Sequence, residues 1–412
     1  MKLFAVVDGF SSGAALAREI RVRGHDCINV LSSPDVPEVF RRSYNRALFS
    51  RELIASDTVA AELGDISPDF IVAGAESGVI LADELSERLG LLTNGTRRSQ
   101  ARRDKYLMAE TVRSAGIRTA EQYRTSDATK AAEWARCLDA FPVVVKPLNS
   151  CGADSVFVCS TPGEVVEGAA RILGHVNQIG LRNKDVLVQE FIFGTEYIVN
   201  TVSRDGRTFV CDIWRCHKER VKGASYISCV EELLPRNGDI QDALSEYAIG
   251  VLDALQILHG PAHFEIMMTR SGPVLIEVGS RLQGATNPAS IREALGTDQL
   301  ALTLQAYLEP ESFRCRIDQP YHFRKAMYHS FMVSPHGGKL IALPRMAELM
   351  NLTTVYHTNM RVDIGGSIER TTGLFSSPGI VDFIHQDARK VADDYATFRA
   401  MEADNFYLVK YP

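Results

Sequence analysis

The chain has 412 residues, 45% of them hydrophobic, which is typical of a globular protein with two or three domains and a large buried core. Its 45 Lys and Arg residues against 51 Asp and Glu residues give a net charge of −6, so the composition provides no general attraction to nucleic acid or to an anionic membrane. The eight cysteines form no C-x-x-C pair, the apolar N-terminal run breaks at Asp8, and no later run approaches the length of a membrane span. We therefore expect a cytoplasmic protein with reduced cysteines and with neither a nucleic-acid nor a membrane partner.

The first part of the chain predicts a parallel sheet. Residues 3–30 read as a strand, a glycine-bearing turn, a helix and a second strand, and residues 70–76 (FIVAGAE) read as a further strand. The turn with Gly9 and Gly13 either binds an anion at a helix N-terminus or is purely structural. The chain contains neither G-x-G-x-x-G nor G-x-x-x-x-G-K-[ST], which excludes the commonest dinucleotide and P-loop sites.

The middle of the chain predicts a helix followed by an α+β region. Residues 97–117 have apolar positions at helical spacing and carry Lys105 near the start of the helix. The stretch 141–159 (FPVVVKPLNSCGADSVFVC) reads as two strands joined by a loop of small residues, with Lys146 at the end of the first strand. Further strands and helices follow, namely a helix at 162–173, strands at 186–191, 196–203 and 208–214, and a helix at 240–258.

Two carboxylates occupy an otherwise apolar hairpin at 262–281 (AHFEIMMTRSGPVLIEVGSR). A turn centred near Ser271 places Glu265 and Glu277 nearly opposite one another, where like charges destabilise a sheet unless a cation compensates them. Oxygen ligands from two neighbouring strands suit Mg²⁺, although two solvated edge glutamates are the alternative. Arg281, just beyond the second strand, offers a planar fork for carboxylate or phosphoryl oxygens.

The order of these features resembles the ATP-grasp superfamily, from about Lys105 to Pro288. Members of that family have a lysine before a hinged subdomain, a second lysine in a V-x-K-P context, a small-residue loop, a Q-E-x-x-x-G-x-E hinge and two acidic metal ligands on a hairpin. The resemblance implies ATP as cofactor together with one or two Mg²⁺ ions, with Mn²⁺ as an alternative metal. The implied ATP-binding residues are Lys105, Lys146, Ser150, Gly152, Ser155, Gln189, Glu190, Phe191, Ile192 and Glu196, and the implied metal ligands are Glu265 and Glu277.

Within this superfamily, the segments E-V-G-S-R-L-x-G, GPAHFE and DIWRCHK look most like the amino-acid ligases that make dipeptides and peptide-like antibiotics. The implied catalytic residues are Arg281, Lys146, His217 and Lys218. Arg281 is expected on the acyl phosphate. His217 and Lys218 either reach the substrate or γ-phosphate or are solvated at a strand end, and His263 either orients a carboxylate or packs in the core. Many ATP-grasp enzymes have Asn where this chain has Gly279, so a second metal ion would lose a ligand or be held differently.

The fold implied is ATP-grasp, with α/β and α+β parts. We expect an N-terminal Rossmann-like parallel-sheet domain at 1–95, connecting helices at 96–140, a mobile lid at 141–200, and a catalytic domain with a C-terminal subdomain at 201–412.

The function implied is ATP-dependent ligation of an amino acid or related small-molecule carboxylate to an amino acid through an acyl phosphate, which gives a dipeptide-like amide, ADP and phosphate. Two residue neighbourhoods are expected to supply the substrate pockets: Arg281 with the loop 282–288 for the acid, and the C-terminal region for the amine. Relatives suggest a homodimer. Alternatives are a biotin-carboxylase-like or purine-pathway ligase, of which a fused carboxylase is disfavoured by the absence of an A-M-K-M segment, or a non-catalytic nucleotide-binding protein.

Overall fold

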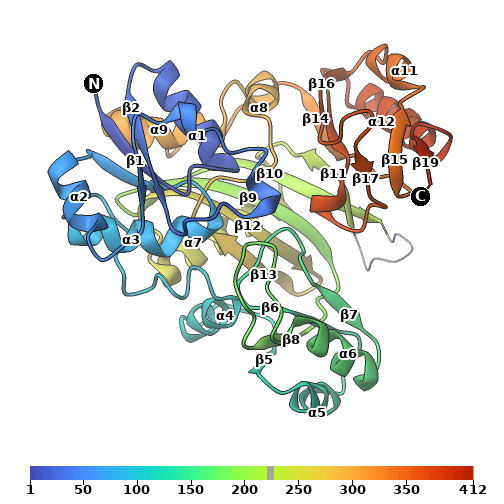
Figure 1. The fold of residues 1–412 in the computed structure, drawn as a ribbon, viewed down its shortest axis with the longest axis horizontal. Coiled ribbons are helices and arrows are strands. Elements are labelled where there is room, and N and C mark those ends of the chain that lie inside the picture. The colour runs from blue at the N-terminus through green and yellow to red at the C-terminus, as the bar shows by residue number, and fades with distance from the viewer. Residues whose placement is uncertain (220–226, 412) are drawn as a thin grey trace.

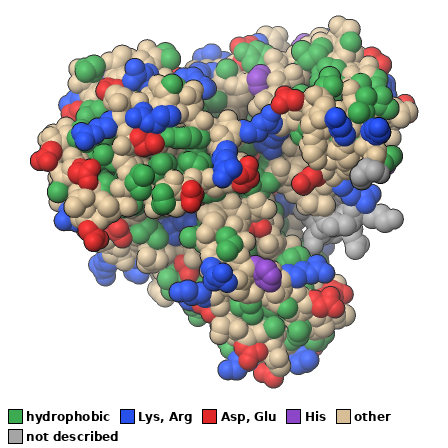
Figure 2. All heavy atoms as spheres, viewed as in Figure 1, with side chains coloured by type: hydrophobic (Ala, Val, Ile, Leu, Met, Phe, Trp, Pro, Cys, Tyr) green, Lys and Arg blue, Asp and Glu red, His purple; other side chains and the backbone are tan. Residues whose placement is uncertain are grey.

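The computed structural model describes residues 1–219 and 227–411 and contains four β-sheets. Figure 1 shows the N-terminal domain and the C-terminal elements on either side of a large central sheet, with the lid projecting below them. Among the described residues, no helix combines the length and the apolar composition that a membrane span requires. On the face shown in Figure 2, acidic and basic side chains are mixed over the surface.

The N-terminal domain is a parallel sheet with strand order β3-β2-β1-β4, as the βαβ pattern predicts. Its strands are buried under helices because both faces of a parallel sheet need covering. The strands are β1 (Leu3–Val7), β2 (Asp26–Leu31), β3 (Glu52–Ile54) and β4 (Phe70–Ala73), and the helices are α1 (Ser12–Val22), η1 (Glu38–Phe40), η2 (Arg46–Leu48), α2 (Val59–Ile66), η3 (Glu76–Gly78) and α3 (Val79–Arg88).

The lid is an antiparallel sheet with strand order β5-β8-β6-β7. Its elements are β5 (Gln122–Thr125), α5 (Ala128–Leu138), β6 (Val143–Pro147), β7 (Phe157–Cys159), α6 (Pro162–Ile172) and β8 (Val186–Glu190). The register Val145↔Phe157 confirms the hairpin that presents Lys146. The expectation of connecting helices throughout 96–140 is wrong at β5, because this short strand pairs with β8 and belongs to the lid sheet.

The helix expected over 97–117 is shorter in the structure. Helix α4 spans Lys105–Ser114, and the Asp104 side chain caps its first turn by accepting hydrogen bonds from the N–H groups of Tyr106 and Leu107. The preceding residues form turns instead, in which the fully buried Arg102 donates to backbone carbonyls and pairs with Asp83.

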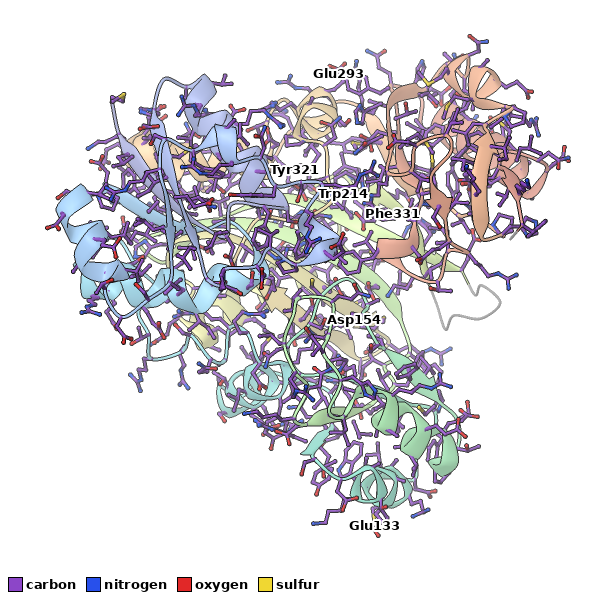
Figure 3. The ribbon with its side chains drawn as sticks, viewed as in Figure 1. Glu133, Asp154, Trp214, Glu293, Tyr321 and Phe331 are labelled. Carbon is purple, nitrogen blue, oxygen red and sulfur yellow. The ribbon has the colours of Figure 1, made fainter. Side chains whose placement is uncertain are left out.

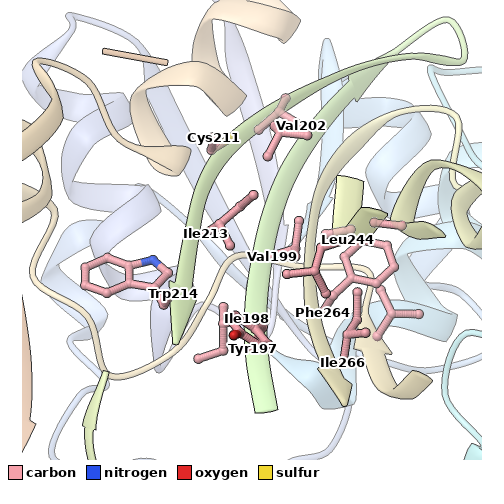
Figure 4. Packing of buried hydrophobic residues seen from close by; sticks show 14 of the residues in the cluster. Tyr197, Ile198, Val199, Val202, Cys211, Ile213, Trp214, Leu244, Phe264 and Ile266 are labelled. Carbon is pink, nitrogen blue, oxygen red and sulfur yellow. The ribbon is translucent and has the colours of Figure 1, made fainter. Parts of the chain in front are cut away.

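The central sheet has eight strands in the order β13-β12-β9-β10-β11-β14-β18-β16. Helix α7 (Asp239–Leu255) packs on one face, where Leu244 lies among Val199, Phe264 and Ile266 in the largest buried cluster (Figure 4). Because side chains alternate along a strand, the residues between these apolar positions point to the opposite face. The strands are β9 (Thr195–Arg204), β10 (Arg207–Glu219), β11 (Ile227–Leu233), β12 (Gly260–Thr269), β13 (Gly272–Gly279), β14 (Ala326–Phe331), β16 (Val355–Met360) and β18 (Gly379–His385).

The C-terminal region contributes β14, β16 and β18 to the central sheet and adds a small sheet of its own, ordered β17-β15-β19. The small sheet and its helices pack on one apolar cluster that includes Phe383 and Phe398. The remaining elements are α8 (Pro288–Leu295), α9 (Gln299–Leu308), α10 (Pro310–Arg314), β15 (Gly338–Ala342), α11 (Met346–Met350), β17 (Ser367–Ile368), η4 (Leu374–Ser376), α12 (Ala388–Ala403) and β19 (Leu408–Lys410).

Candidate active site

Two carboxylates face each other on the edge of the central sheet. Glu265 on β12 and Glu277 on β13 are direct cross-strand partners, as the hairpin predicts. Their side chains are 34% and 18% exposed, so neither is a freely solvated edge residue. Burial, followed by the neighbouring Glu277 and Glu196 carboxylates, raises the pKa of Glu265. Two carboxylates held opposite one another in this way form a natural site for a divalent cation.

Two lysines approach the carboxylates from the lid side. Lys105 Nζ lies 2.6 Å from Glu277 Oε2 and donates to the Ser150 carbonyl at 2.8 Å. Burial alone would lower the pKa of Lys105, but the Glu277 carboxylate outweighs it and raises that pKa. Lys146 is 5% exposed and forms no ion pair within residues 1–219 and 227–411, and burial together with the Lys105 charge lowers its pKa to about 8. A buried ammonium group of this kind is suited to binding an anionic ligand.

The small-residue loop 149–155 is organised around Asp154, which Figure 3 labels where the lid meets the rest of the molecule. The hydroxyls of Ser150 and Ser155 donate to its two oxygens at 2.7 and 2.9 Å. Gly152 has a φ of +66°, and a Cβ atom there would lie 2.5 Å from the Phe375 ring of η4. The C-terminal region therefore contacts this loop directly, and only glycine fits at the contact.

Arg281 is held by Glu76, a residue of the N-terminal domain. Its Nε donates to Glu76 Oε2 at 2.6 Å, and Glu76, buried at the end of the N-terminal sheet, also pairs with Arg103. Burial would raise the pKa of Glu76, but Arg103, Arg281 and Lys105 outweigh it and lower that pKa to about 2. A Cβ atom on Gly279 would lie 2.8 Å from Glu76 Oε2, so the missing side chain makes room for this ion-pair cluster.

Glu76 and Arg103 were not predicted as site residues. Glu76 follows β4 at the carboxyl end of a parallel strand, which is where open α/β sheets usually bind ligands. That position is the signal in the sequence that could have identified it. Arg103 is one of several basic residues in the segment 97–105, and no local pattern distinguishes it from its neighbours.

Glu196 and Lys218 lie on the same face as Glu265 and Glu277 and bind each other, with Lys218 Nζ 2.5 Å from Glu196 Oε2. Burial would lower the pKa of Lys218, but Glu196 and Glu265 outweigh it and raise that pKa. The hinge residues Gln189 and Ile192 are buried, and Ile192 packs against Val274 of β13. Glu190 and Phe191 are half-buried beside them. Recognition of adenine and ribose by the segment 189–196 stays a prediction.

His217 does not reach the site. Its Nε2 lies 2.8 Å from Glu232 Oε2, and its side chain is 43% exposed. In register, Glu231 pairs with Cys216 whereas Glu232 pairs with Arg215, so His217 and Glu232 point to the face opposite Glu231. The structure therefore does not bring His217 together with the other predicted site residues, whereas Lys218 lies beside Glu196. A catalytic part for Lys218 stays a prediction.

His263 is both buried and adjacent to the Glu265 carboxylate. Its Nδ1 lies 2.9 Å from Asn200 Oδ1, and its Nε2 lies 4.0 Å from Glu265 Oε1. The Asn200 amide nitrogen donates to Asp212 and Gln283, so the Asn200 oxygen accepts and His263 Nδ1 must be the donor. Burial, followed by the charge of Arg281, lowers the pKa of His263 to about 3, which keeps the ring neutral beside Glu265.

Comparison with known proteins identifies the family. A model of the ATP-grasp domain matches residues 102–285. Dapdiamide A synthase of Enterobacter agglomerans is 30% identical over 415 residues, an alignment that covers 99% of this chain and 97% of that protein. The chain belongs to the ATP-grasp family. As an ATP-grasp enzyme it is an ADP-forming ligase that makes a carbon–nitrogen bond.

Two further relatives of this ATP-grasp enzyme are amino-acid ligases. The L-arginine-specific L-amino acid ligase of Bacillus subtilis is 22% identical over 263 residues, which is 63% of this chain and 63% of that protein. The crystal structure of an L-amino acid ligase from Bacillus licheniformis superposes with a TM-score of 0.76 at 18% identity and covers 100% of this chain and 99% of that chain. This superposition shows that the fold is shared over the whole length.

ATP-grasp enzymes use ATP with a divalent metal ion, and the residues of this site fit both. Lys146 is a buried cation without an anionic partner among the described residues, which suits phosphate oxygens. Glu265 and Glu277 supply two hard oxygen donors, and no third His, Cys, Asp or Glu completes a closed metal site within the described part of the chain. Such an incomplete set suits Mg²⁺, which keeps positions for water and nucleotide phosphates.

Proposed function

We propose that this ATP-grasp ligase joins an amino acid or a related carboxylate to the amine of an amino acid, and that the product is a dipeptide-like amide. The observation that carries the proposal is the gathering of Lys105, Lys146, Glu265, Glu277 and Arg281 around one face of the sheet. A carboxylate of the first substrate would attack the γ-phosphate of ATP, releasing ADP and forming an acyl phosphate. The amine would then attack the acyl carbon, phosphate would leave, and the nitrogen would lose its proton.

The side chains of the site have distinct parts in this scheme. Lys105 and Lys146 would hold the phosphate oxygens, and Arg281 would stabilise the oxyanion formed when the amine attacks. Glu265 and Glu277 would hold Mg²⁺, which supplies charge neutralisation for phosphoryl transfer. Lid closure would exclude water, which otherwise hydrolyses an acyl phosphate.

Glu76 has a positioning part in the scheme. It fixes Arg281 from the N-terminal domain through the Nε contact at 2.6 Å. Arg281 is therefore positioned before substrate binds, which saves reorganisation during the reaction. A homodimer remains a prediction and is not needed for these steps.

The test is a matrix of carboxylates and amines with ATP and Mg²⁺, read out by ADP formation and by mass spectrometry of the products. Acids are first screened with hydroxylamine as a small general nucleophile, which traps an acyl phosphate as a hydroxamate. We expect ADP formation that depends on one acid and an amide that appears with a matching amino acid.

Glu277→Gln is expected to abolish ADP formation in this test, and Glu133→Gln, on the exposed face of lid helix α5, is the matched control. ADP formation with bicarbonate alone would instead favour the carboxylase-like alternative. ATP binding without turnover on any acid would favour the non-catalytic alternative.

A further inference from the structure

The polar face of the central sheet continues beyond the candidate active site. Glu231 on β11, His329 on β14 and Asp382 on β18 are successive cross-strand partners, so their side chains share one face. They are 7%, 2% and 0% exposed. Glu231 also pairs in register with Cys216, which is two residues from Lys218 of the candidate active site. A buried row of ionisable groups therefore extends from the active site toward the C-terminal region.

This row has unused hydrogen-bonding capacity. His329 Nδ1 lies 2.6 Å from Asp382 Oδ1, and the other Asp382 oxygen accepts from Ser290 Oγ. His329 Nε2 is buried and has no hydrogen-bond partner among the described residues. Glu231 accepts one hydrogen bond, from Gln283 Nε2 at 3.2 Å. Buried polar atoms in folded proteins are normally satisfied, so the unpaired His329 nitrogen beside the Glu231 carboxylate indicates a place for a polar ligand.

A cation without an anionic partner lies at the same end of the sheet. Arg361 directly follows β16, is half-buried, and donates Nη1 to the Leu374 carbonyl at 2.7 Å. No carboxylate within residues 1–219 and 227–411 forms an ion pair with it, and burial lowers its pKa. His357 is the register partner of Asp382, and Arg361 lies four residues further along, directly after the end of the same strand. Burial would lower the pKa of His329, but Asp382 and Glu231 outweigh it and raise that pKa, while the charge of Arg361 acts against them.

We propose that Glu231, His329 and Arg361 form the subsite for the amine substrate, and that this substrate is an amino acid bound through both its ammonium and its free carboxylate. The ammonium group donates to Glu231, and the carboxylate accepts from His329 Nε2 and from the Arg361 guanidinium. Asp382 is a positioning residue that fixes the His329 ring through Nδ1. This inference rests on the proposed function and names the class of its second substrate.

The connection to the reaction centre determines which end of the amino acid faces Arg281. Gln283 binds Glu231 through its Nε2 and Asn200 through its Oε1, and it is two residues from Arg281 in the chain. The ammonium end therefore lies nearer the acyl phosphate, and the carboxylate end lies toward the C-terminal region. The acid substrate, in contrast, is phosphorylated on its carboxylate by ATP. That carboxylate is therefore not free to bind Arg361.

The experiment compares two products from the same acid, namely the amide made with the amino acid and the hydroxamate made with hydroxylamine. Hydroxylamine has no carboxylate and does not need the proposed subsite. For Arg361→Met, we expect the KM of the amino acid to rise about 100-fold, as for the loss of a charge-assisted pair, while hydroxamate synthesis stays within about twofold of wild type. Arg370→Met, an exposed arginine in the same loop region, is the matched control and should change neither.

A second readout separates recognition from structural damage. Wild type should strongly prefer the amino acid to the corresponding amine that lacks the carboxylate, and Arg361→Met should lose this preference because both amines then bind alike. Arg361→Lys keeps the charge without the planar fork and should show a smaller rise in KM, so it decides the question if Arg361→Met does not fold. Glu231→Gln should raise the KM of both amines.

The possible outcomes are distinguishable. The subsite would be overturned if the KM of the amino acid stayed within about threefold of wild type in both Arg361 variants. It would also be overturned if these variants raised the KM of the acid substrate and not that of the amino acid. Hydroxamate and amide both absent from wild type with every acid would overturn the proposed function, and the subsite with it. Normal hydroxamate synthesis with a lost preference between the two amines supports the subsite.

Discussion

The two halves of the polar sheet face differ in how their charges are arranged. In the half beneath the lid, Glu265, Glu277 and Lys105 form a tight group, and Lys146 lies beside them without an ion pair among the described residues. In the half toward the C-terminus, Arg361 and His329 carry open positions for a ligand. The first half suits a polyanion with a metal ion, and the second suits a zwitterion. Under the two proposals, one sheet would separate phosphate chemistry from amine recognition.

Removing Lys146 should have the largest effect on activity, because Lys146 lies in the half beneath the lid, which the syntheses of amide and hydroxamate both need. We expect Lys146→Met to lower amide and hydroxamate synthesis alike by at least about 1,000-fold, since a buried charge that stabilises transferring phosphate is lost. ADP formation with saturating acid is the measurement. Lys130→Met, on the exposed side of α5 in the same lid, is the control. A variant at Lys146 that still makes hydroxamate within about tenfold of wild type would contradict the division between the two halves.

Removing the Glu76 charge should disturb the link between the N-terminal domain and Arg281. Glu76→Gln leaves Arg103 and Arg281 buried without their carboxylate, which we expect to lower the free energy of unfolding by about 3–5 kcal/mol and both syntheses by about 100-fold. Denaturant unfolding and ADP formation measure the two effects. Glu84→Gln, exposed on α3, is the control.

The pH dependence of the same variant is a sharper test of the Glu76 cluster. Because the folded pKa of Glu76 is lowered from 4.5 to about 2, its stabilisation is present above pH 4.5 and is lost as the pH falls toward 2. Wild type should therefore lose more stability than Glu76→Gln over this interval. Equal losses in both proteins would show that the cluster does not stabilise the fold.

The half of the sheet face beneath the lid could be predicted from the sequence, because its residues lie in patterns formed by neighbouring residues of the chain. The turn of a hairpin sets the register of its two strands, so spacing could place Glu265 and Glu277 nearly opposite one another. A register shift between Glu265 and Ile266, which spacing does not predict, makes them direct partners. The strand-end position of Lys146 could also be predicted, since β-formers and a small-residue loop bracket it.

The half toward the C-terminus could not be predicted in this way. Its residues come together through the order of the strands in the sheet, which short sequence patterns do not reveal. Glu231, His329 and Asp382 are neighbours because β11, β14 and β18 are adjacent in the sheet, although about 100 and 50 residues of chain separate them. His217 was misplaced for a related reason: the alternation of a strand was clear, but which face carried the active site was not. The lid strand β5 was missed because its four residues, QYRT, carry little apolar pattern.

Adding a side chain at Gly279 should distinguish a missing metal ligand from an occupied space. A Cβ atom there would lie 2.8 Å from Glu76 Oε2 and 3.3 Å from Arg281 Cζ, so Gly279→Asn should displace the pair and lower both syntheses by about 10- to 100-fold. ADP formation measured over a Mg²⁺ titration checks this. Higher activity or tighter Mg²⁺ dependence in the variant would show instead that the site lacks only a ligand.

The contact between the small-residue loop and η4 should give the smallest effect, and it tests whether the C-terminal half influences the ATP half. Gly152→Ala places a methyl group 2.5 Å from the Phe375 ring at a φ of +66°, so we expect the KM of ATP to rise about tenfold. Phe375→Ala alone removes one packing contact and should raise this KM only about twofold to threefold.

The double variant should recover part of the loss in Gly152→Ala, because the clash is relieved while the backbone strain remains. Comparing the KM of ATP in the four proteins gives the coupling between the two residues directly. Strictly additive effects would mean that the loop is strained by its own backbone and that Phe375 does not constrain it. Partial recovery would mean that the C-terminal region, which also carries Arg361, helps to set the shape of the loop beside Lys146, so that the two halves of the face act together.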